Sequence, residues 1–377
     1  MKGLGTAAIV LAVAGPCAAQ APSASPSPSA RNRSRFEFSL RLQGAYDDNV
    51  FRTAAEVDGY IGDASAGLAY SRQSRRSSLQ LEGQATAERY KEYGELSRID
   101  YAGRGALNLT VFRRTTINLN QTYASSYTRD IPALANEGLV LPLVVANRAE
   151  STLQVGHPLS ARWRVDLDGR YERVFFPDQQ LSNGEELTVF PSLQRRFGRS
   201  FSVAVGYAFQ ESRSGGLDDQ AHGVLGGIRR RPPKGVGYLL LGGAAYLPQT
   251  QTTIGIGTGE LSFNRKKDRA AARYERGIRH AFGLGRQVIS DLFSFTVSRD
   301  LARSLTLQGS GTIGINNDPV DPDFRFRSDT YTGSLQWAVT PELSANAGFT
   351  HWRSTLGRGE VTPSNRGYVS LGYRVGW

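Results

Sequence analysis

Apolar and polar residues alternate along much of the chain. The first clear run sets four apolar side chains against four polar ones: Phe36, Phe38, Leu40 and Leu42 against Glu37, Ser39, Arg41 and Gln43. Similar runs recur at 79–88, 163–171 and 201–209. A period of two gives a β-strand one apolar and one polar face, so the pattern predicts an all-β protein.

The polar faces of these strands carry many charges. One strand alone holds five on a single phase: Arg164, Asp166, Asp168, Arg170 and Glu172. In a soluble sandwich the apolar face would pack against a second sheet. In a membrane barrel it faces lipid, and the polar face lines the lumen. After the amino-terminal segment no stretch has the roughly 18 consecutive apolar residues of a spanning helix. We therefore expect a transmembrane antiparallel β-barrel.

The breaks between strands set the expected strand number. Short basic turns such as 72–76 and 299–303 alternate with longer connections, as periplasmic turns alternate with extracellular loops in outer-membrane barrels. The count is about 18 strands, with 16 as the alternative, and an even number places both termini in the periplasm.

One segment breaks the regular alternation. Between Thr252 and Phe282 the apolar phase changes, from that of Ile254 and Ile256 to that of Leu261. An extra residue in one strand would cause such a change. We expect a bulge or a shifted strand boundary there.

The amino terminus has the layout of a secretory signal peptide, with Lys2, an apolar run at 7–14 and small residues up to Ala19. We predict a signal peptide at 1–19, a disordered Pro/Ser/Arg periplasmic tether at 20–34 and the barrel at 35–377. A lipoprotein signal that uses Cys17 is the alternative, although Pro16 fits it poorly. The sequence has one cysteine, so cleavage after Ala19 leaves no thiol for disulfide, metal or redox chemistry.

The formal net charge is +11 and the isoelectric point is about 9.9. Such a charge in a cytoplasmic protein would suggest nucleic acid, but a secreted chain does not meet that partner. Outer-membrane lipid, lipopolysaccharide and acidic glycans are the expected anionic partners. The expected location is the bacterial outer membrane.

The last residues alternate to a terminal aromatic. One face holds Val369, Leu371, Tyr373, Val375 and Trp377. This strand resembles the terminal recognition strand of outer-membrane proteins. The resemblance implies the barrel assembly machinery as a partner, and Trp377 as part of the assembly signal.

Candidate chemistry is sparse. The four histidines, His157, His222, His280 and His351, show no metal-ligand spacing, and we expect neither a metal nor a cofactor. Ser212, Asp219 and His222 fall around one hairpin and could form a hydrolase site, although a loop histidine beside an aspartate is common. We expect no enzyme.

Two further segments have a ligand-binding alternative. Residues 316–323 are rich in oxygen ligands and could bind calcium, but they lack the glycine and distal glutamate of an EF-hand loop, so a solvated loop is the preferred interpretation. Gly255, Gly257 and Gly259 lack the βαβ context of a dinucleotide site. They are interpreted as strand flexibility.

The charged residues on the polar faces of the predicted strands form a set of predicted pore-lining residues. They are Glu37, Arg41, Arg104, Arg148, Glu150, Arg164, Asp166, Arg170, Glu172, Arg273 and Arg279. Mixed charge implies a water-filled interior, and a barrel of about 18 strands leaves an aqueous channel. The alternative is that these charges only pair with one another. The apolar loop from Thr128 to Val145 either folds into the mouth and narrows the channel or caps the neighbouring loops.

Near the end of the first strand stand Ala45 to Arg52, with the motif residues Tyr46, Asp47, Asp48, Asn49 and Phe51. This segment, followed by barrel strands, resembles the outer-membrane β-barrel porin families linked to exopolysaccharide gene clusters. The resemblance implies an outer-membrane conduit for a secreted polysaccharide that works with a periplasmic polysaccharide-export protein. A general or solute-specific diffusion porin is the alternative, and a hydrolase or adhesin is the third hypothesis.

Overall fold

The computed structural model describes most of the chain after residue 32. The described residues are 33–53, 55–112, 114–128, 143–177, 181–198, 200–232, 235–319, 321, 324–356 and 361–377. The predicted signal peptide and nearly all of the predicted tether lie outside them. The first strand begins at Arg33, two residues before the predicted start of the barrel.

The described chain forms an 18-stranded antiparallel sheet, as predicted. The strands are β1 (Arg33–Asp47), β2 (Gly59–Gln73), β3 (Ser77–Tyr90), β4 (Arg98–Val111), β5 (Thr115–Tyr127), β6 (Val145–Pro158), β7 (Trp163–Phe175), β8 (Gly184–Phe197), β9 (Phe201–Ser214), β10 (Leu217–Arg230), β11 (Gly235–Leu247), β12 (Thr252–Asn264), β13 (Asp268–Ala281), β14 (Arg286–Asp300), β15 (Leu305–Asn317), β16 (Arg325–Ala338), β17 (Leu343–Leu356) and β18 (Val361–Gly376). A short 3-10 helix, η1 (Gly94–Leu96), follows β3. Within the described residues no helix is long and apolar enough to cross a membrane.

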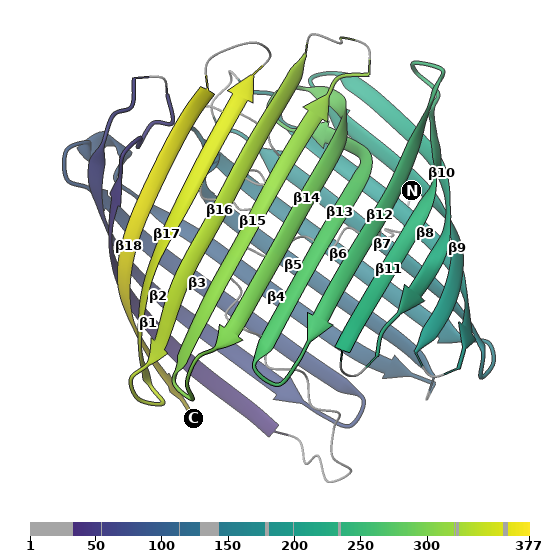
Figure 1. Ribbon diagram of the computed structural model, residues 1–377, viewed down its shortest axis with the longest axis horizontal. Coiled ribbons are helices and arrows are strands. Elements are labelled where there is room, and N and C mark those ends of the chain that lie inside the picture. Colours follow the sequence, from purple (N-terminus) through teal and green to yellow (C-terminus); the bar gives the residue numbers. More distant parts are fainter. Residues whose placement is uncertain are drawn as a thin grey trace.

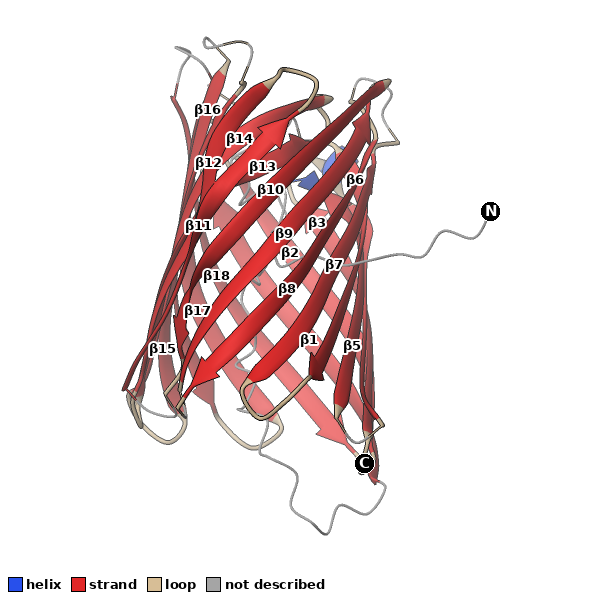
Figure 2. Cartoon of the chain, turned by 90° about the vertical axis from the view of Figure 1, so that its right-hand side faces the viewer, coloured by secondary structure: helices blue, strands red, loops and turns tan. Residues whose placement is uncertain are grey.

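The sheet closes because β1 pairs with both β2 and β18. The β1–β18 register runs from Glu37 opposite Gly376 to Asp47 opposite Arg366. Phe36 and Trp377 complete it by exchanging two backbone hydrogen bonds of 3.0 Å. Figures 1 and 2 show the resulting cylinder of tilted strands. Closure satisfies the backbone groups that an open edge would leave unpaired.

The two faces of the sheet have opposite chemistry. The outward phase carries exposed apolar side chains such as Leu42, Leu68 and Val369, each more than 60% exposed. The inward phase carries charged residues that are largely buried, among them Arg170 and Glu172. A soluble protein would place these residues the other way round. An apolar exterior around a polar interior is the arrangement that lipid requires.

The two ends of the barrel differ in their connections. At the end that holds the start of β1 and Trp377, every connection between strands has three or four residues. We call this the turn end. At the other, the loop end, connections range from the two residues Gly215 and Gly216 to the long segment between β5 and β6. Both glycines have positive φ, of 59° and 85°, as a tight two-residue hairpin requires.

Candidate functional site: the lumen and its narrowed mouth

The β13–β14 hairpin leaves the barrel wall at the loop end. β12 and β13 pair only from Gly257 opposite Arg276 down to the turn end, although β13 and β14 stay paired up to Ala281. Beyond the split, Gly283 forms an antiparallel bridge with Ser182, which precedes β8. The two backbone hydrogen bonds of this bridge measure 3.1 Å. Because β8 lies five strands from β13 around the barrel, the hairpin tip lies inside the mouth.

Apolar contacts hold this hairpin in place. At its tip, Phe282 packs in a buried cluster with Ala146, Val174 and Phe176 of the opposite wall. A Cβ atom at Gly184 would come within 2.8 Å of the Phe282 ring, so glycine leaves the space that the ring needs. The tip is therefore seated in the wall and does not hang free in the lumen.

The root of the hairpin covers a second apolar patch. Ile278 and Ile289 pack against lumen-facing residues of β10, β11 and β12, namely Ala221, Ala245, Leu247 and Ile254. This explains the change of phase seen in the sequence. The prediction of a bulge at that point was wrong for β12, because its pairing with β11 runs without interruption from Thr252 to Asn264. Ile254 faces inward because the hairpin covers it, while Leu261 faces outward.

Four ionised side chains form a buried network on the wall of β6 and β7. Arg148 Nε lies 2.5 Å from Glu172 Oε1, and Arg148 Nη2 lies 2.5 Å from Glu150 Oε2. Arg170 Nε lies 3.4 Å from Glu150 Oε1, and Arg170 also pairs with Glu172. Each carboxylate thus contacts two guanidinium groups. Charges this buried are retained because each one has several partners of opposite sign.

The infolded hairpin brings a second charged group to this network. On β13, Glu275 accepts from Arg273 at 2.5 Å and from Arg279 at 3.1 Å. Arg279 also interacts electrostatically with Glu172 and with Glu186 of β8. The narrowed mouth therefore holds four arginines and four glutamates from four strands.

Glu186 ties the hairpin backbone to the wall. Its Oε2 accepts from the backbone N–H of His280 at 3.3 Å and from Gln210 Nε2 at 3.0 Å. Sequence reasoning did not select Glu186, Glu275 or Phe282. Glu275 lies on the same inward face of β13 as Arg273 and Arg279. The alternation along the strand would therefore have placed it among the predicted pore-lining residues. Glu186 and Phe282 become significant only when the hairpin folds inward.

The eleven predicted pore-lining residues all occupy the phase opposite the exposed apolar residues. Six of them lie in the narrowed mouth: Arg148, Glu150, Arg170, Glu172, Arg273 and Arg279. Arg104, Arg164 and Asp166 line a wider cavity nearer the turn end, which Arg148 and Glu150 also border. Glu37 and Arg41 lie on β1, away from both groups, where Glu37 pairs with Arg374 at 3.0 Å. A role in conduction stays a prediction for all eleven.

The wider cavity has a volume of about 980 Å³. The lumen faces of β5 to β11 form most of its wall, with Arg104 of β4. Its lining mixes arginines, amides, hydroxyls and a few apolar side chains. We call it the chamber.

The motif residues near the end of β1 join the first strand to the last. Asp48 accepts two hydrogen bonds from Asn365, at 2.6 Å from the backbone N–H and at 2.7 Å from the side chain. Asp47 Oδ1 accepts from Ser364 Oγ at 3.0 Å, and Asn49 Nδ2 donates to the Pro363 carbonyl at 2.9 Å.

The aromatic members of the motif lie at the edge of this seam. Tyr46 donates to Asp58 at 3.1 Å, and the Phe51 ring meets the Tyr93 ring edge-on at 5.2 Å. The motif thus holds the first strand against the last strand at the loop end of the barrel. Its role in the structure is one of architecture.

The candidate hydrolase residues do not converge. Ser212 and Asp219 face inward as directly paired residues of β9 and β10. His222 lies on the outward phase, where its Nδ1 is 2.6 Å from the Tyr207 hydroxyl. The sheet therefore separates the histidine from the serine and aspartate.

The other ligand-binding alternatives have structural explanations. Asp318, in the segment considered for calcium, pairs with Arg286 at 2.9 Å. Residues 320, 322 and 323 of that segment lie outside the described residues. Across the described ranges, no three His, Cys, Asp or Glu side chains are grouped to hold a metal ion. The three alternating glycines, 255, 257 and 259, lie within β12.

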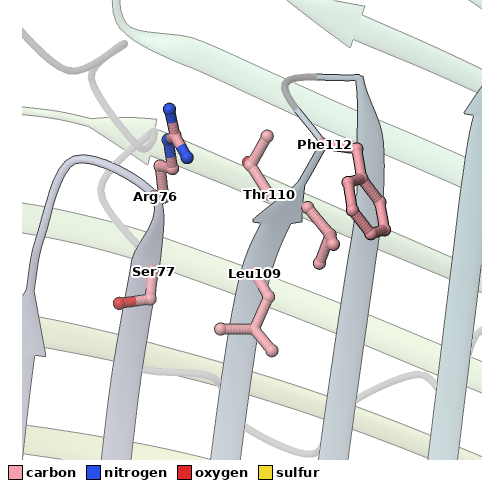
Figure 3. Close-up of a pocket in the computed structure, with 6 residues that line it drawn as sticks. Arg76, Ser77, Leu109, Thr110 and Phe112 are labelled. Atoms are coloured by element: carbon pink, nitrogen blue, oxygen red, sulfur yellow. The ribbon is translucent and has the colours of Figure 1, made fainter.

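A shallow groove at the turn end of β3 and β4 lies outside the lumen. It is lined by Arg76, Ser77 and residues 109–112 (Figure 3). Phe112, in the β4–β5 turn, is 88% exposed. The groove belongs to the outer surface near the level where aromatic residues commonly meet the lipid headgroups.

A family model described as "Putative beta-barrel porin 2" matches residues 36–191, from β1 into β8. With the closed barrel and its apolar exterior, this match decides the compartment. The protein is an outer-membrane β-barrel. The family description is that of a channel, and it names no polysaccharide.

Several solved structures resemble this outer-membrane barrel. OccAB4 of Acinetobacter baumannii is 11% identical, with 91% of this chain and 98% of that chain covered and a TM-score of 0.46. The outer membrane protein opdK of Pseudomonas aeruginosa is 10% identical, with 91% and 99% covered and a TM-score of 0.45. The siderophore receptor PirA of Pseudomonas aeruginosa is 9% identical, with 92% and 81% covered and a TM-score of 0.48. No curated protein sequence matches the chain.

Proposed function

We propose that this barrel is a diffusion channel for small hydrophilic solutes, and that the β13–β14 hairpin narrows its mouth. The observation that carries the proposal is the polar lumen of an 18-stranded barrel. Barrels of 16 to 18 strands are too wide for wall side chains to fill, so their interior holds water. A hairpin folded into such a lumen limits the size of the solutes that pass.

The middle of the lumen wall on β14 to β17 is neutral. These strands present small hydroxyl side chains to the interior, including Ser294, Ser310, Thr312, Thr332, Ser334 and Thr350. A solute would pass between this wall and the arginines and glutamates of β6, β7 and β13. Short hydroxyls offer weak hydrogen bonds, which favour passage over tight binding.

In this proposal the loop end faces the cell exterior and both termini lie in the periplasm, because short turns are periplasmic in outer-membrane barrels. The narrow hairpin then lies at the outer mouth. The chamber lies on the periplasmic side of it. A solute from outside meets the size limit first and the arginine-lined chamber second.

Export of a polysaccharide, which the resemblance implies, stays a prediction. The hairpin that occupies the mouth suits a small solute better than a continuous polymer chain. The periplasmic export protein and the assembly machinery likewise stay predicted partners. A deletion strain separates the two functions: loss of solute uptake with normal polysaccharide favours the porin, and loss of polysaccharide favours the conduit.

The channel itself is tested with purified protein in planar bilayers. Residues 278–289 are replaced by Asn-Gly, which joins the paired residues Gly277 and Ser290 through a two-residue turn. We expect the wild type to conduct and the shortened variant to conduct more. A folded wild-type barrel that passes no current would overturn the proposal.

A further inference from the structure

We infer that the chamber is a binding subsite for a small hydroxylated organic anion, such as a monosaccharide acid. The inference rests on the proposed channel function and names a substrate class for it. At about 980 Å³ the chamber has the size of sites that bind small molecules. Three kinds of wall meet in it, and each recognises a different part of such a solute.

The first wall is a surface of amides and hydroxyls on β5 and β6. Six inward positions on these strands that line the chamber are of this type: Thr116, Asn118, Asn120, Thr122, Thr152 and Gln154. Asn120 donates to Thr152 at 3.3 Å. Amide side chains both donate and accept hydrogen bonds, which matches the hydroxyl groups of a sugar.

The second wall is cationic. Seven arginines line the chamber against three carboxylates: Arg104, Arg148, Arg162, Arg164, Arg196, Arg229 and Arg231 against Glu150, Asp166 and Asp168. The backbone of Arg104 pairs with β3 and β5, but its side chain forms no hydrogen bond or ion pair with another residue in the described part of the chain. Arginine binds a carboxylate through two parallel hydrogen bonds. The surplus of arginines therefore favours an anionic solute.

A glycine connects these two walls. Arg164 pairs with Asp166 at 2.5 Å and also reaches Thr116 on β5 at 3.3 Å. To do so it crosses Gly156 of β6, where a Cβ atom would lie only 1.8 Å from the guanidinium group. Glycine at this position thus lets a cationic group lie beside the amide wall. One solute can contact both.

The third wall is apolar and lies on β8 to β11. The Phe190 ring covers Gly206, where a Cβ atom would come within 2.5 Å of the ring. Leu225, Leu239 and Leu241 continue this surface. Carbon–hydrogen groups on the flat face of a sugar ring would pack against it, as apolar lining generally supports small ligands.

The combination selects the class of solute. A neutral sugar would use the amide and apolar walls but leave the arginines without an anion. An aliphatic carboxylate would use the arginines and the apolar wall but would gain no hydrogen bonds from the amides, which would stay bound to water. A sugar acid uses all three.

Three solutes of similar ring size separate these possibilities: glucuronate, glucose and cyclohexanecarboxylate. Each is added to wild-type channels in planar bilayers at low salt, and block of the potassium chloride current is measured. We expect half-block by glucuronate at a concentration about tenfold below the other two, equivalent to about 1.4 kcal/mol. Raising the salt should weaken the preference over glucose, because salt screens the arginines.

Two double variants test which wall of the chamber recognises which part of the solute. Arg104→Gln with Arg229→Gln should remove the preference for glucuronate over glucose. Asn118→Leu with Asn120→Leu should remove the preference over cyclohexanecarboxylate. The matched controls are Arg374→Gln and Asn346→Leu, which change the same residue types on β18 and β17, outside the chamber lining. They should keep both preferences.

The outcomes distinguish this inference from the channel proposal. Equal block by all three solutes in a conducting wild type overturns the subsite and leaves the channel standing. An unchanged preference for glucuronate in both double variants of the chamber also overturns the subsite and leaves the channel standing. A folded barrel without conductance overturns the channel and the subsite together. Heat-modified migration on gels shows that each variant is assembled before it is measured.

Discussion

The carboxylate of Asp48 in the first loop accepts both the backbone and the side-chain N–H groups of Asn365 in the last strand, at 2.6 and 2.7 Å. The two residues stand 317 positions apart in the sequence. They join the first strand to the last at the loop end of the barrel, as Phe36 and Trp377 do at the turn end. The seam between β1 and β18 is thus fastened at both ends.

Replacing Asp48 with Ala should destabilise this seam. The change leaves two Asn365 donors without their acceptor, at a cost of about 1–3 kcal/mol. We expect a lower temperature for loss of the folded band on gels, with normal conductance below it. Asp58→Ala is the control, because Asp58 bonds the Tyr46 hydroxyl at an exposed position of the same loop. An equal effect of both changes would contradict a specific role for Asp48.

Trp377→Glu should impair assembly of the barrel. Trp377 is 68% exposed on the outer surface, and its ring stacks on Phe36 at 6.5 Å. Trp337→Glu is the matched control, since Trp337 is also exposed on the outside but lies in β16. Surface levels of each variant are measured by blotting isolated outer membranes. Normal levels of Trp377→Glu, or equal loss in both variants, would count against a terminal assembly signal.

Gly184→Leu should displace the tip of the infolded hairpin. The new side chain would occupy the space of the Phe282 ring, and overpacking of this kind costs about 1–3 kcal/mol. We expect a higher single-channel conductance or frequent switching to a higher level. Gly83→Leu is the control, because a Cβ atom at Gly83 would meet nothing within 4 Å. An unchanged conductance in Gly184→Leu would mean that the hairpin does not limit the current.

Glu172→Gln should both destabilise the barrel and shift its ion selectivity. Arg148 and Arg170 share this carboxylate, and removing one partner of a buried pair costs about 3–5 kcal/mol. We expect a lower denaturation midpoint, and a reversal potential in a salt gradient that moves toward anions. Glu211→Gln removes an outward, more exposed ion pair with Arg213, so it should change neither by much. Equal midpoints for the two variants would contradict the network.

Deletion of residues 132–142 tests the second candidate for narrowing the mouth. For the apolar loop from Thr128 to Val145 the sequence leaves two alternatives, folding into the mouth or capping the neighbouring loops, and residues 129–142 lie outside the described part of the structure. If the loop narrows the channel, its deletion raises the conductance. If the hairpin alone sets the limit, the conductance stays at the wild-type value, while the shortened hairpin still raises it.

The local pattern was enough to predict the fold. Each strand shows its two faces through a period of two, so Leu42 could be assigned to the exterior and Arg170 to the interior without any knowledge of neighbouring strands. The even count of about 18, with 16 as the alternative, followed from the turns, which are also local. Strand phase likewise placed Arg148, Glu150 and Glu172 on one side of the sheet.

The partners of these residues were beyond the reach of a local pattern. A period of two says that Arg279 faces inward, but not that β13 bends across the lumen to bring it near Glu172. The same holds for Ile254, whose inward position is explained by Ile278 and Ile289 of the infolded hairpin.

The sequence by itself determined an outer-membrane barrel, because alternation, turns and the final aromatic strand are properties of neighbouring residues. Only the tertiary structure decided where that barrel is narrow and which walls form the chamber. Those features depend on contacts between strands far apart in sequence, such as Phe282 beside Gly184 and Arg164 above Gly156. Such packing depends on the fit of shape and charge across the lumen. The alternation along a single strand contains no information about that fit.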